Sequence, residues 1–174
     1  MHPSDFPVRL RARRTKDRKR AGHIDATTVS CVLLAANDPL ALAATQAAQT
    51  GDLAALWALL DGHPGLASAE IGDPGPGGMR RTLLHAATDW PGHYPNNVTI
   101  VKLLIGHGAD VNARFAGPHT ETPLHWAASS DDVEVLDALL DAGADIEATG
   151  AVIGGGTPIA DATGGWRCRV RRVG

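Results

Sequence analysis

The sequence predicts an all-α fold, a solenoid of about three and a half helix–turn–helix repeats with disordered basic termini. Two observations point to it. An apolar pattern recurs at intervals along the chain, and the composition is 44% hydrophobic but only 4% aromatic. The apolar residues are mostly Ala, Leu and Val, a mixture that favours closely stacked helices over one large core.

Three segments carry the recurring pattern and are the predicted second helices of the repeats: Leu53–Leu60, Val98–Ile105 and Val133–Leu140. Their shared apolar residues fall at offsets of zero, three, six and seven, which lie on one face of a helix. Leu104 and Leu139 belong to the column at offset six. We expect both to be buried between stacked repeats.

A shorter first helix is predicted upstream of each of these segments. The residues 122–128, Thr-Pro-Leu-His-Trp-Ala-Ala, correspond to residues 82–88 and, degenerately, to residues 42–48. Thr122 suits the N-cap position because its hydroxyl can accept from a free backbone N–H, and Pro123 suits the first helical position. The paired alanines that follow allow neighbouring helices to approach closely.

The Thr-Pro-Leu-His motif at 122–125, the double alanine and the run Gly-Ala-Asp-Ile-Glu-Ala at 143–148 resemble the ankyrin repeat. The resemblance covers roughly residues 40–163. Repeat 1 lacks the Thr-Pro-Leu-His signature, and a fourth repeat begins at Thr157 with Ala160 in the histidine position. The resemblance implies a non-catalytic scaffold or adaptor that binds a protein through a concave surface of first helices and loop tips.

Two departures from the repeat stand out. Ten positions separate Thr88 from Val98, against five between Ala128 and Val133, so repeat 2 has five additional residues between its helices. This insertion includes Trp90, Pro91, His93, Tyr94 and Pro95. In the fourth repeat, a Gly-Gly pair at 164–165 interrupts the pattern before a second helix, which leaves part of Leu136 and Leu140 in repeat 3 without cover.

The resemblance also implies which positions face a partner. They are Gln49, Thr50, Asp89, Trp90, His119, Glu121, Ser129 and Ser130. Because aromatic residues concentrate interface energy, Trp90, Tyr94 and Phe115 are the predicted anchors. The alternative for Trp90 is that the insertion folds back and buries it against repeat 3. Trp126 lies inside a first helix and is expected to pack there.

The charges separate the body from both ends. Eight of the 16 basic residues lie in 9–20 and four in 167–172, whereas 17 of the 19 acidic residues lie in 21–166. We therefore divide the chain into a disordered basic segment 1–37, a repeat domain 38–163, and an irregular basic tail 164–174 that is truncated, frame-shifted or a short functional segment. The acidic body attracts basic partners and repels nucleic acid, although a solvated surface explains it equally well.

Two other functions remain open on this charge pattern. The basic N-terminal segment could attach an adaptor to nucleic acid or an anionic surface, but it has no interleaved aromatic residues for base stacking. Alternatively, the acidic face could block a basic enzyme site, as a regulatory subunit or immunity-type inhibitor does. The sequence favours a protein partner over nucleic acid.

The histidines do not suggest a metal site. His85 and His125 occupy the same repeat position, and the resemblance implies that each fixes the turn before its helix through hydrogen bonds. No Cys or carboxylate stands at a ligand spacing from either. His93, His107 and His119 are scattered over predicted loops and a helix end.

No catalytic or cofactor motif appears. The glycine-rich residues 72–78 lack the order of a phosphate-binding loop and follow no predicted strand, so a flexible inter-repeat loop is expected. Cys31 and Cys168 are isolated, which favours a reducing, cytoplasmic compartment. There is also no apolar run of about 18 residues that could span a membrane. We expect no enzyme activity, cofactor, metal or small-molecule substrate.

Overall fold

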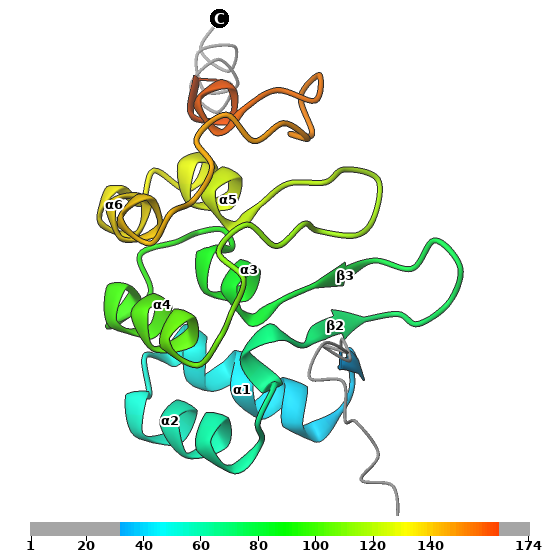
Figure 1. Cartoon of the computed structure of the whole chain (residues 1–174), viewed down its shortest axis with the longest axis vertical. Coiled ribbons are helices and arrows are strands. Elements are labelled where there is room, and N and C mark those ends of the chain that lie inside the picture. Colours follow the sequence, from blue (N-terminus) through cyan, green and yellow to red (C-terminus); the bar gives the residue numbers. More distant parts are fainter. Residues whose placement is uncertain (1–31, 164–174) are drawn as a thin grey trace, which may run out of the picture.

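The computed structural model of the chain describes residues 32–163. Helices stack in layers of two along the long axis of the molecule (Figure 1). The three complete layers are α1 and α2, then α3 and α4, then α5 and α6. Their bounds are Pro39–Thr50 and Leu53–Gly62, Leu83–Thr88 and Asn97–Gly106, and Pro123–Ser129 and Val133–Asp141.

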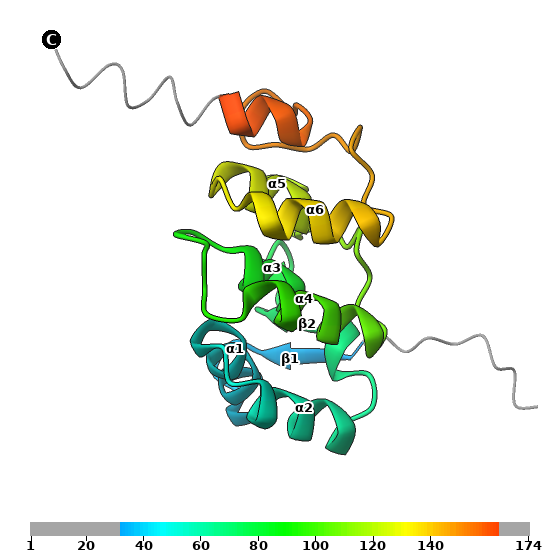
Figure 2. The ribbon, with the colours of Figure 1, turned by 90° about the vertical axis from the view of Figure 1, so that its left-hand side faces the viewer.

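The layers form two rows of helices. The first helices of the repeats, α1, α3 and α5, pack in one row, and α2, α4 and α6 pack in the other. Figure 2 shows the second row from the outside, with each pair stacked above the previous one. This arrangement confirms the predicted helix–turn–helix solenoid. We call the helices of the first row the inner helices and those of the second row the outer helices.

Aspartate residues fix the starts of three helices. Asp38 Oδ1 accepts from the backbone N–H of Leu40 at 2.8 Å at the start of α1. Asp52 and Asp132 cap α2 and α6 in the same way. A carboxylate at this position satisfies a free N–H group and interacts favourably with the helix dipole. The aspartate that precedes each of these three helices therefore helps to determine the residue at which the helix begins.

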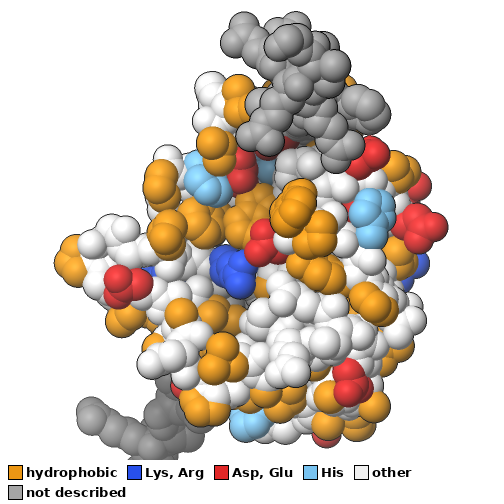
Figure 3. Space-filling view, turned by 180° about the vertical axis from the view of Figure 1, so that it is seen from behind, with side chains coloured by type: hydrophobic (Ala, Val, Ile, Leu, Met, Phe, Trp, Pro, Cys, Tyr) orange, Lys and Arg blue, Asp and Glu red, His pale blue; other side chains and the backbone are white. Residues whose placement is uncertain are grey.

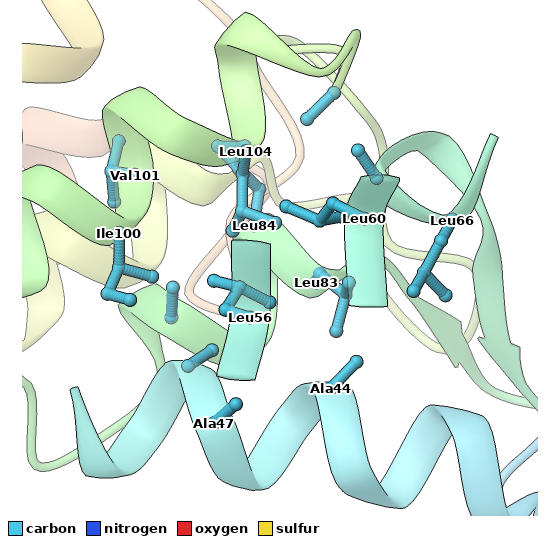
Figure 4. Packing of buried hydrophobic residues seen from close by; sticks show 14 of the residues in the cluster. Ala44, Ala47, Leu56, Leu60, Leu66, Leu83, Leu84, Ile100, Val101 and Leu104 are labelled. Carbon is cyan, nitrogen blue, oxygen red and sulfur yellow. The ribbon is translucent and has the colours of Figure 1, made fainter. Parts of the chain in front are cut away.

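Leucine, isoleucine and valine side chains from successive layers meet between the two rows (Figure 4). Leu56, Leu104 and Leu139 have no exposed surface. On α1 the buried positions are alanines, among them Ala44 and Ala47, so the outer helices pack close to its backbone. Burial of Leu104 and Leu139 confirms the predicted helix register.

A small three-stranded sheet accompanies the helices, which the sequence did not predict. The strands are β1 (Leu33–Ala35), β2 (Glu70–Gly72) and β3 (Arg80–Arg81), and a short 3₁₀ helix, η1 (Leu66–Ser68), precedes β2. The order is β1-β2-β3, with β1 parallel to β2 and β2 antiparallel to β3. In register, Leu34 pairs with Ile71 and Ile71 with Arg81.

Two predictions are corrected by this sheet. Residues 33–35 form a strand although 1–37 was expected to be disordered, and residues 72–78 close a β-hairpin although an unstructured loop with no preceding strand was expected. The strands are only two or three residues long, too short for an alternating pattern to be read. Residues 1–31 and 164–174, on which the predictions of disordered or irregular ends fall, lie outside the described residues.

The fourth repeat begins as predicted. A helix starts at residue 158, directly after Thr157, and is described as far as residue 163. Leu140 of the preceding layer is 37% exposed, and Leu136 is only partly buried. This confirms that part of the distal face of repeat 3 lies open.

Candidate protein-binding surface

A paired threonine and histidine begin each of the inner helices α3 and α5. The Oγ1 atom of Thr82 lies 2.9 Å from Nδ1 of His85, and the Thr82 backbone N–H donates to the same nitrogen at 3.3 Å. Thr122 and His125 repeat this arrangement at 2.9 and 3.1 Å. A backbone N–H can only donate, so Nδ1 is the acceptor and the ring proton is on Nε2.

The Nε2 atom of each histidine joins its repeat to the next one. His85 Nε2 donates to the backbone carbonyl of Glu121 at 3.1 Å, and His125 Nε2 donates to that of Gly156 at 3.3 Å. Both carbonyls belong to the residue directly before the next threonine of the series. Burial lowers the pKa of His85 to about 4, so its ring is neutral at pH 7. The predicted structural role of these histidines is confirmed.

A groove of about 670 Å³ lies on the concave side of the array, where helix α1 faces the β2–β3 hairpin. Leu42 and Gln46 of α1 contribute to one wall, Met79 of the hairpin to another, and Trp126 of α5 to the end. Leu42 and Met79 are 54% and 60% exposed. Apolar surface is thus open to solvent within a hollow, which is typical of a binding site.

Aromatic rings form the end of the groove nearest α5. Trp126 meets His85 edge-on with 5.0 Å between ring centroids, and it lies 5.7 Å from Phe115. Phe115 stacks on the half-buried His119 at 4.4 Å. The Trp126 Nε1 atom donates to Glu121 Oε2 at 2.8 Å. Trp126 therefore packs within the repeat, as predicted, and still lines the groove.

Three predicted partner-facing residues are buried. Phe115 and Glu121 are each 7% exposed, and Ser130 is 9% exposed. The carboxylate of Glu121 also accepts from the backbone N–H of Val152 at 2.7 Å, so it joins α5 to the loop that follows α6. Little of Glu121 and Ser130 is therefore open to a partner, whereas Phe115, although mostly buried, still lines the groove.

Ion pairs neutralise the basic residues of the groove. Arg81 donates to Asp89 Oδ2 at 2.7 Å, and Arg80 Nε lies 3.0 Å from Glu70 Oε2. All four side chains are about one third exposed. Figure 3 looks onto this face and shows Lys and Arg side chains near its centre, with hydrophobic side chains around them. The groove therefore has an apolar character with paired charges.

The insertion of repeat 2 is fixed to the turns of both neighbouring repeats. On one side, Asn96 Nδ2 donates to the carbonyl of Gly51 at 3.0 Å. On the other, the backbone N–H of His93 donates to Asp132 Oδ2 at 2.9 Å, and Gly92 packs against Ser130. The insertion thus forms the middle of a continuous row of turns, which we call the turn row (residues 50–52, 89–96 and 130–132).

Trp90 projects from this turn row. Its side chain is 76% exposed, so the alternative in which the insertion buries it against repeat 3 is wrong. Tyr94 is partly buried, and its hydroxyl donates to the Trp90 carbonyl at 3.4 Å. Gln49 and Thr50 line the groove, and Ser129 is exposed at the end of α5.

Sequence reasoning missed Leu42, Gln46 and Met79 as groove residues. Gln46 could have been identified, because it occupies the same repeat position as Trp126. It follows Leu42 by four residues, as Trp126 follows Thr122. No signal existed for Met79, because its position depends on the short β2–β3 hairpin. Side chains from a helix and from a hairpin meet here only through the tertiary fold.

The part of the chain described by the structure holds no group of three or more His, Cys, Asp or Glu side chains that could bind a metal ion. Over the same residues, none of the helices has the length and apolar character needed to cross a membrane. The groove residues themselves carry amides, hydroxyls, aromatic rings, aliphatic side chains and paired charges. This chemistry suits recognition of another surface.

Comparison with known proteins agrees with the fold. The family model described as ankyrin repeats (3 copies) matches residues 44–150, more than half of the chain. Rabankyrin-5 of Homo sapiens is 42% identical over 96 residues, which cover 49% of this chain and 8% of that protein. Rabankyrin-5 of Mus musculus is 40% identical over the same length, with the same coverage.

A shorter match is to palmitoyltransferase AKR1 of Kluyveromyces lactis, 50% identical over 50 residues, or 29% of this chain and 6% of that protein. The chain thus spans less than a tenth of the length of each of these relatives. Ankyrin repeats are generally non-catalytic modules of protein–protein interaction. With its family match, its threonine–histidine boxes and its stacked helix pairs, the chain belongs to the ankyrin-repeat family.

Proposed function

We propose that this protein is a non-catalytic scaffold or adaptor that binds a protein partner across the concave groove and the adjoining turn row. Trp90 is the central anchor of this surface. The observation that carries the proposal is its 76% exposed indole on a loop held by both neighbouring repeats. A large aromatic side chain on a rigid loop loses little conformational entropy when it is buried by a partner.

The groove extends the same surface. Gln49 and Thr50 line the groove, and Thr50 is also the first residue of the turn row, so one partner can contact both surfaces. The side-chain amides of Gln46 and Gln49 can bind a peptide backbone, while Leu42 and Met79 offer apolar contacts. The matches to Rabankyrin-5 and the palmitoyltransferase cover only a small part of those proteins. This supports the proposal that the repeat array of this chain is an interaction module. A cytoplasmic location, expected from the isolated cysteines, belongs to the same proposal.

A comparison of two tryptophan variants tests the proposal. The full chain would be used to capture proteins from the lysate of its source organism, and a captured protein would then be purified and titrated. Trp90→Ala should weaken this binding by more than about 2 kcal/mol without a change in circular dichroism. Trp57→Ala is the matched control, because Trp57 is 53% exposed but lies on the outer helix α2. Equal binding by the Trp90 variant and the wild type would refute the anchor.

A further inference from the structure

The first helix of the fourth repeat has a small contact surface with the rest of the array. This helix (residues 158–163), which we call the fourth-repeat helix, lies beyond α5 in the stack of Figure 2. Its buried residues are Pro158 and Asp161, which are three positions apart and therefore lie on one face. Ile159 occupies the position of the buried Leu124 in α5, yet it is 70% exposed. The helix is thus held by one proline and one acidic side chain.

Asp161 has a buried oxygen without a hydrogen-bond donor. The residue is 7% exposed, and its Oδ2 atom has no hydrogen-bond partner among the described residues. A buried carboxylate normally accepts hydrogen bonds or pairs with a cation, because an unpaired charge is strongly disfavoured away from water. This position therefore favours the neutral, protonated form of the side chain.

A second buried acidic residue lies near Asp161. Glu121 accepts from the backbone N–H of Val152 at 2.7 Å and from Trp126 Nε1 at 2.8 Å. Trp126 follows Thr122 by four residues, as Asp161 follows Thr157, so the stacking of repeats brings Asp161 toward the Trp126–Glu121 pair. Burial, together with the charge of Glu121, raises the pKa of Asp161 from 3.8 to about 6.

The neighbouring groups do not neutralise Asp161. His119 faces Glu121, with 3.3 Å between Nδ1 and Oε2. Burial lowers the pKa of His125, whose Nε2 donates to a backbone carbonyl, so its ring is neutral at pH 7. Arg114 is exposed and donates to two backbone carbonyls, and residues 115–163 include no lysine or arginine. The acidic residues of α6 and of the loop after it are exposed: Glu134, Asp137, Asp141, Asp145 and Glu147.

We propose that Asp161 is a pH-sensitive switch: its protonated side chain holds the fourth-repeat helix against α5, and its ionisation releases the helix. Ionisation places a second negative charge in the buried region that already contains Glu121, and release returns this charge to water. Few apolar contacts oppose the release, since Ile159 faces solvent. Release uncovers the part of the array against which Pro158 and Asp161 pack.

The direction of the switch follows from proton binding. The docked helix binds the proton more tightly than the released helix, because the pKa of Asp161 is about 6 when it is buried and 3.8 when it is in water. Docking is therefore favoured in acid and weakens as the pH rises from 3.8 to about 6. Between pH 5.0 and 8.0 the equilibrium constant for release should increase about tenfold.

Hydrogen exchange of the full chain, followed by NMR, tests the switch. Protection factors, corrected for the intrinsic exchange rate at each pH, should fall about tenfold for the amides of residues 160–163 between pH 5.0 and 8.0. The amides of α4 are the internal reference, and their protection should not fall over this range. Protection of residues 160–163 that is equal at both pH values, or higher at pH 8.0, would overturn the proposal.

Two aspartate variants assign the effect to one side chain. Asp161→Asn keeps the shape of the residue but cannot ionise, so residues 160–163 should be equally protected at both pH values. Asp141→Asn makes the same change at the exposed end of α6 and should retain the tenfold decrease. A decrease in Asp161→Asn as large as in the wild type would show that another group controls the helix.

A direct titration covers the case in which asparagine itself prevents docking. The side-chain carboxyl carbon of Asp161 in the wild-type chain, labelled with ¹³C, would be followed by NMR from pH 3 to 8. Its chemical shift should change with a pKa of about 6, and the loss of protection in residues 160–163 should accompany it. A pKa close to the ordinary 3.8 would refute the switch. None of these measurements requires a partner, so their outcome is independent of the Trp90→Ala capture experiment.

Discussion

The Nε2 atom of His85 donates to the backbone carbonyl of Glu121, 36 residues later and one repeat further along the array. The same ring accepts the N–H of Thr82 through Nδ1, so one side chain closes its own repeat and holds the next. His125 forms the equivalent bond to Gly156. Neighbouring repeats are therefore joined by directional bonds as well as by apolar contact.

Replacing His85 with alanine should destabilise the whole array. The change leaves the Thr82 N–H and the Glu121 carbonyl without partners in a buried region and creates a cavity. We expect the free energy of unfolding to fall by about 3 kcal/mol, measured by urea denaturation. His63→Ala, at an exposed residue after α2, should change it by less than about 0.5 kcal/mol. A loss below about 1 kcal/mol for the His85 variant would contradict the bridging role.

Stability should also decrease in mild acid because of His85. Burial lowers the pKa of this histidine in the folded chain from 6.5 to about 4. Its contribution is fully present above pH 6.5 and is lost as the pH falls toward 4, since the unfolded chain then binds a proton that the folded chain excludes. Between pH 7.5 and 5.0 the expected loss is about 2 kcal/mol.

A double comparison isolates this effect from other titrating groups. Burial lowers the pKa of His125 as well, which acts in the same direction, whereas burial next to Glu121 raises the pKa of Asp161 to about 6. Asp161 therefore contributes stability that is present at low pH and lost as the pH rises through 6. The free energies of unfolding of the wild type and of His85→Gln are measured by urea denaturation at both pH values. His125 and Asp161 contribute to the pH dependence of both proteins, so the difference between the two pH dependences gives the contribution of His85. A pH dependence unchanged by His85→Gln would refute the assignment.

Leu104 tests the packing between layers. Its side chain has no exposed surface and lies among residues of all three layers. Leu104→Ala should reduce the free energy of unfolding by about 2–5 kcal/mol. Ile146→Ala is the control, because Ile146 is 55% exposed in the loop after α6. Similar losses for the two variants would be inconsistent with the stacked register.

Gly51 tests the attachment of the insertion to repeat 1. Its φ is +73°, and a Cβ atom at this position would collide with the backbone of Pro95. Gly51→Ala should therefore cost at least about 1 kcal/mol from the backbone conformation alone and displace the insertion. Gly62→Ala is a matched control, since a Cβ there meets nothing within 4 Å. Thermal unfolding measures the stability of both variants.

The sequence was sufficient to predict the repeated helix pairs because their apolar columns and threonine–histidine boxes follow local rules. Leu104 is an example, since its offset within the segment identifies the buried face. The strand Leu33–Ala35 could not be predicted, because it forms only by pairing with Glu70–Gly72, far along the chain. Local patterns cannot predict a pairing of three residues between distant segments.

The partner surface was predicted less completely for a related reason. Position within the repeat places Glu121 and Ser130 at the edge of the concave face, but specific contacts with Val152 and Gly92 bury them. The exposure of Trp90 depends on the path of an insertion that has no counterpart in the other repeats. Which side of a loop faces solvent follows from its attachments, and those attachments lie in neighbouring repeats.

The attachment of the insertion has a consequence for how such an array can evolve. Repeat 2 depends on Gly51 from the repeat before it and on Asp132 from the repeat after it. Duplication or exchange of repeat 2 alone would separate the insertion from one of these residues. We therefore expect single units to be added or removed at the ends of the array with less loss of structure than within these three repeats.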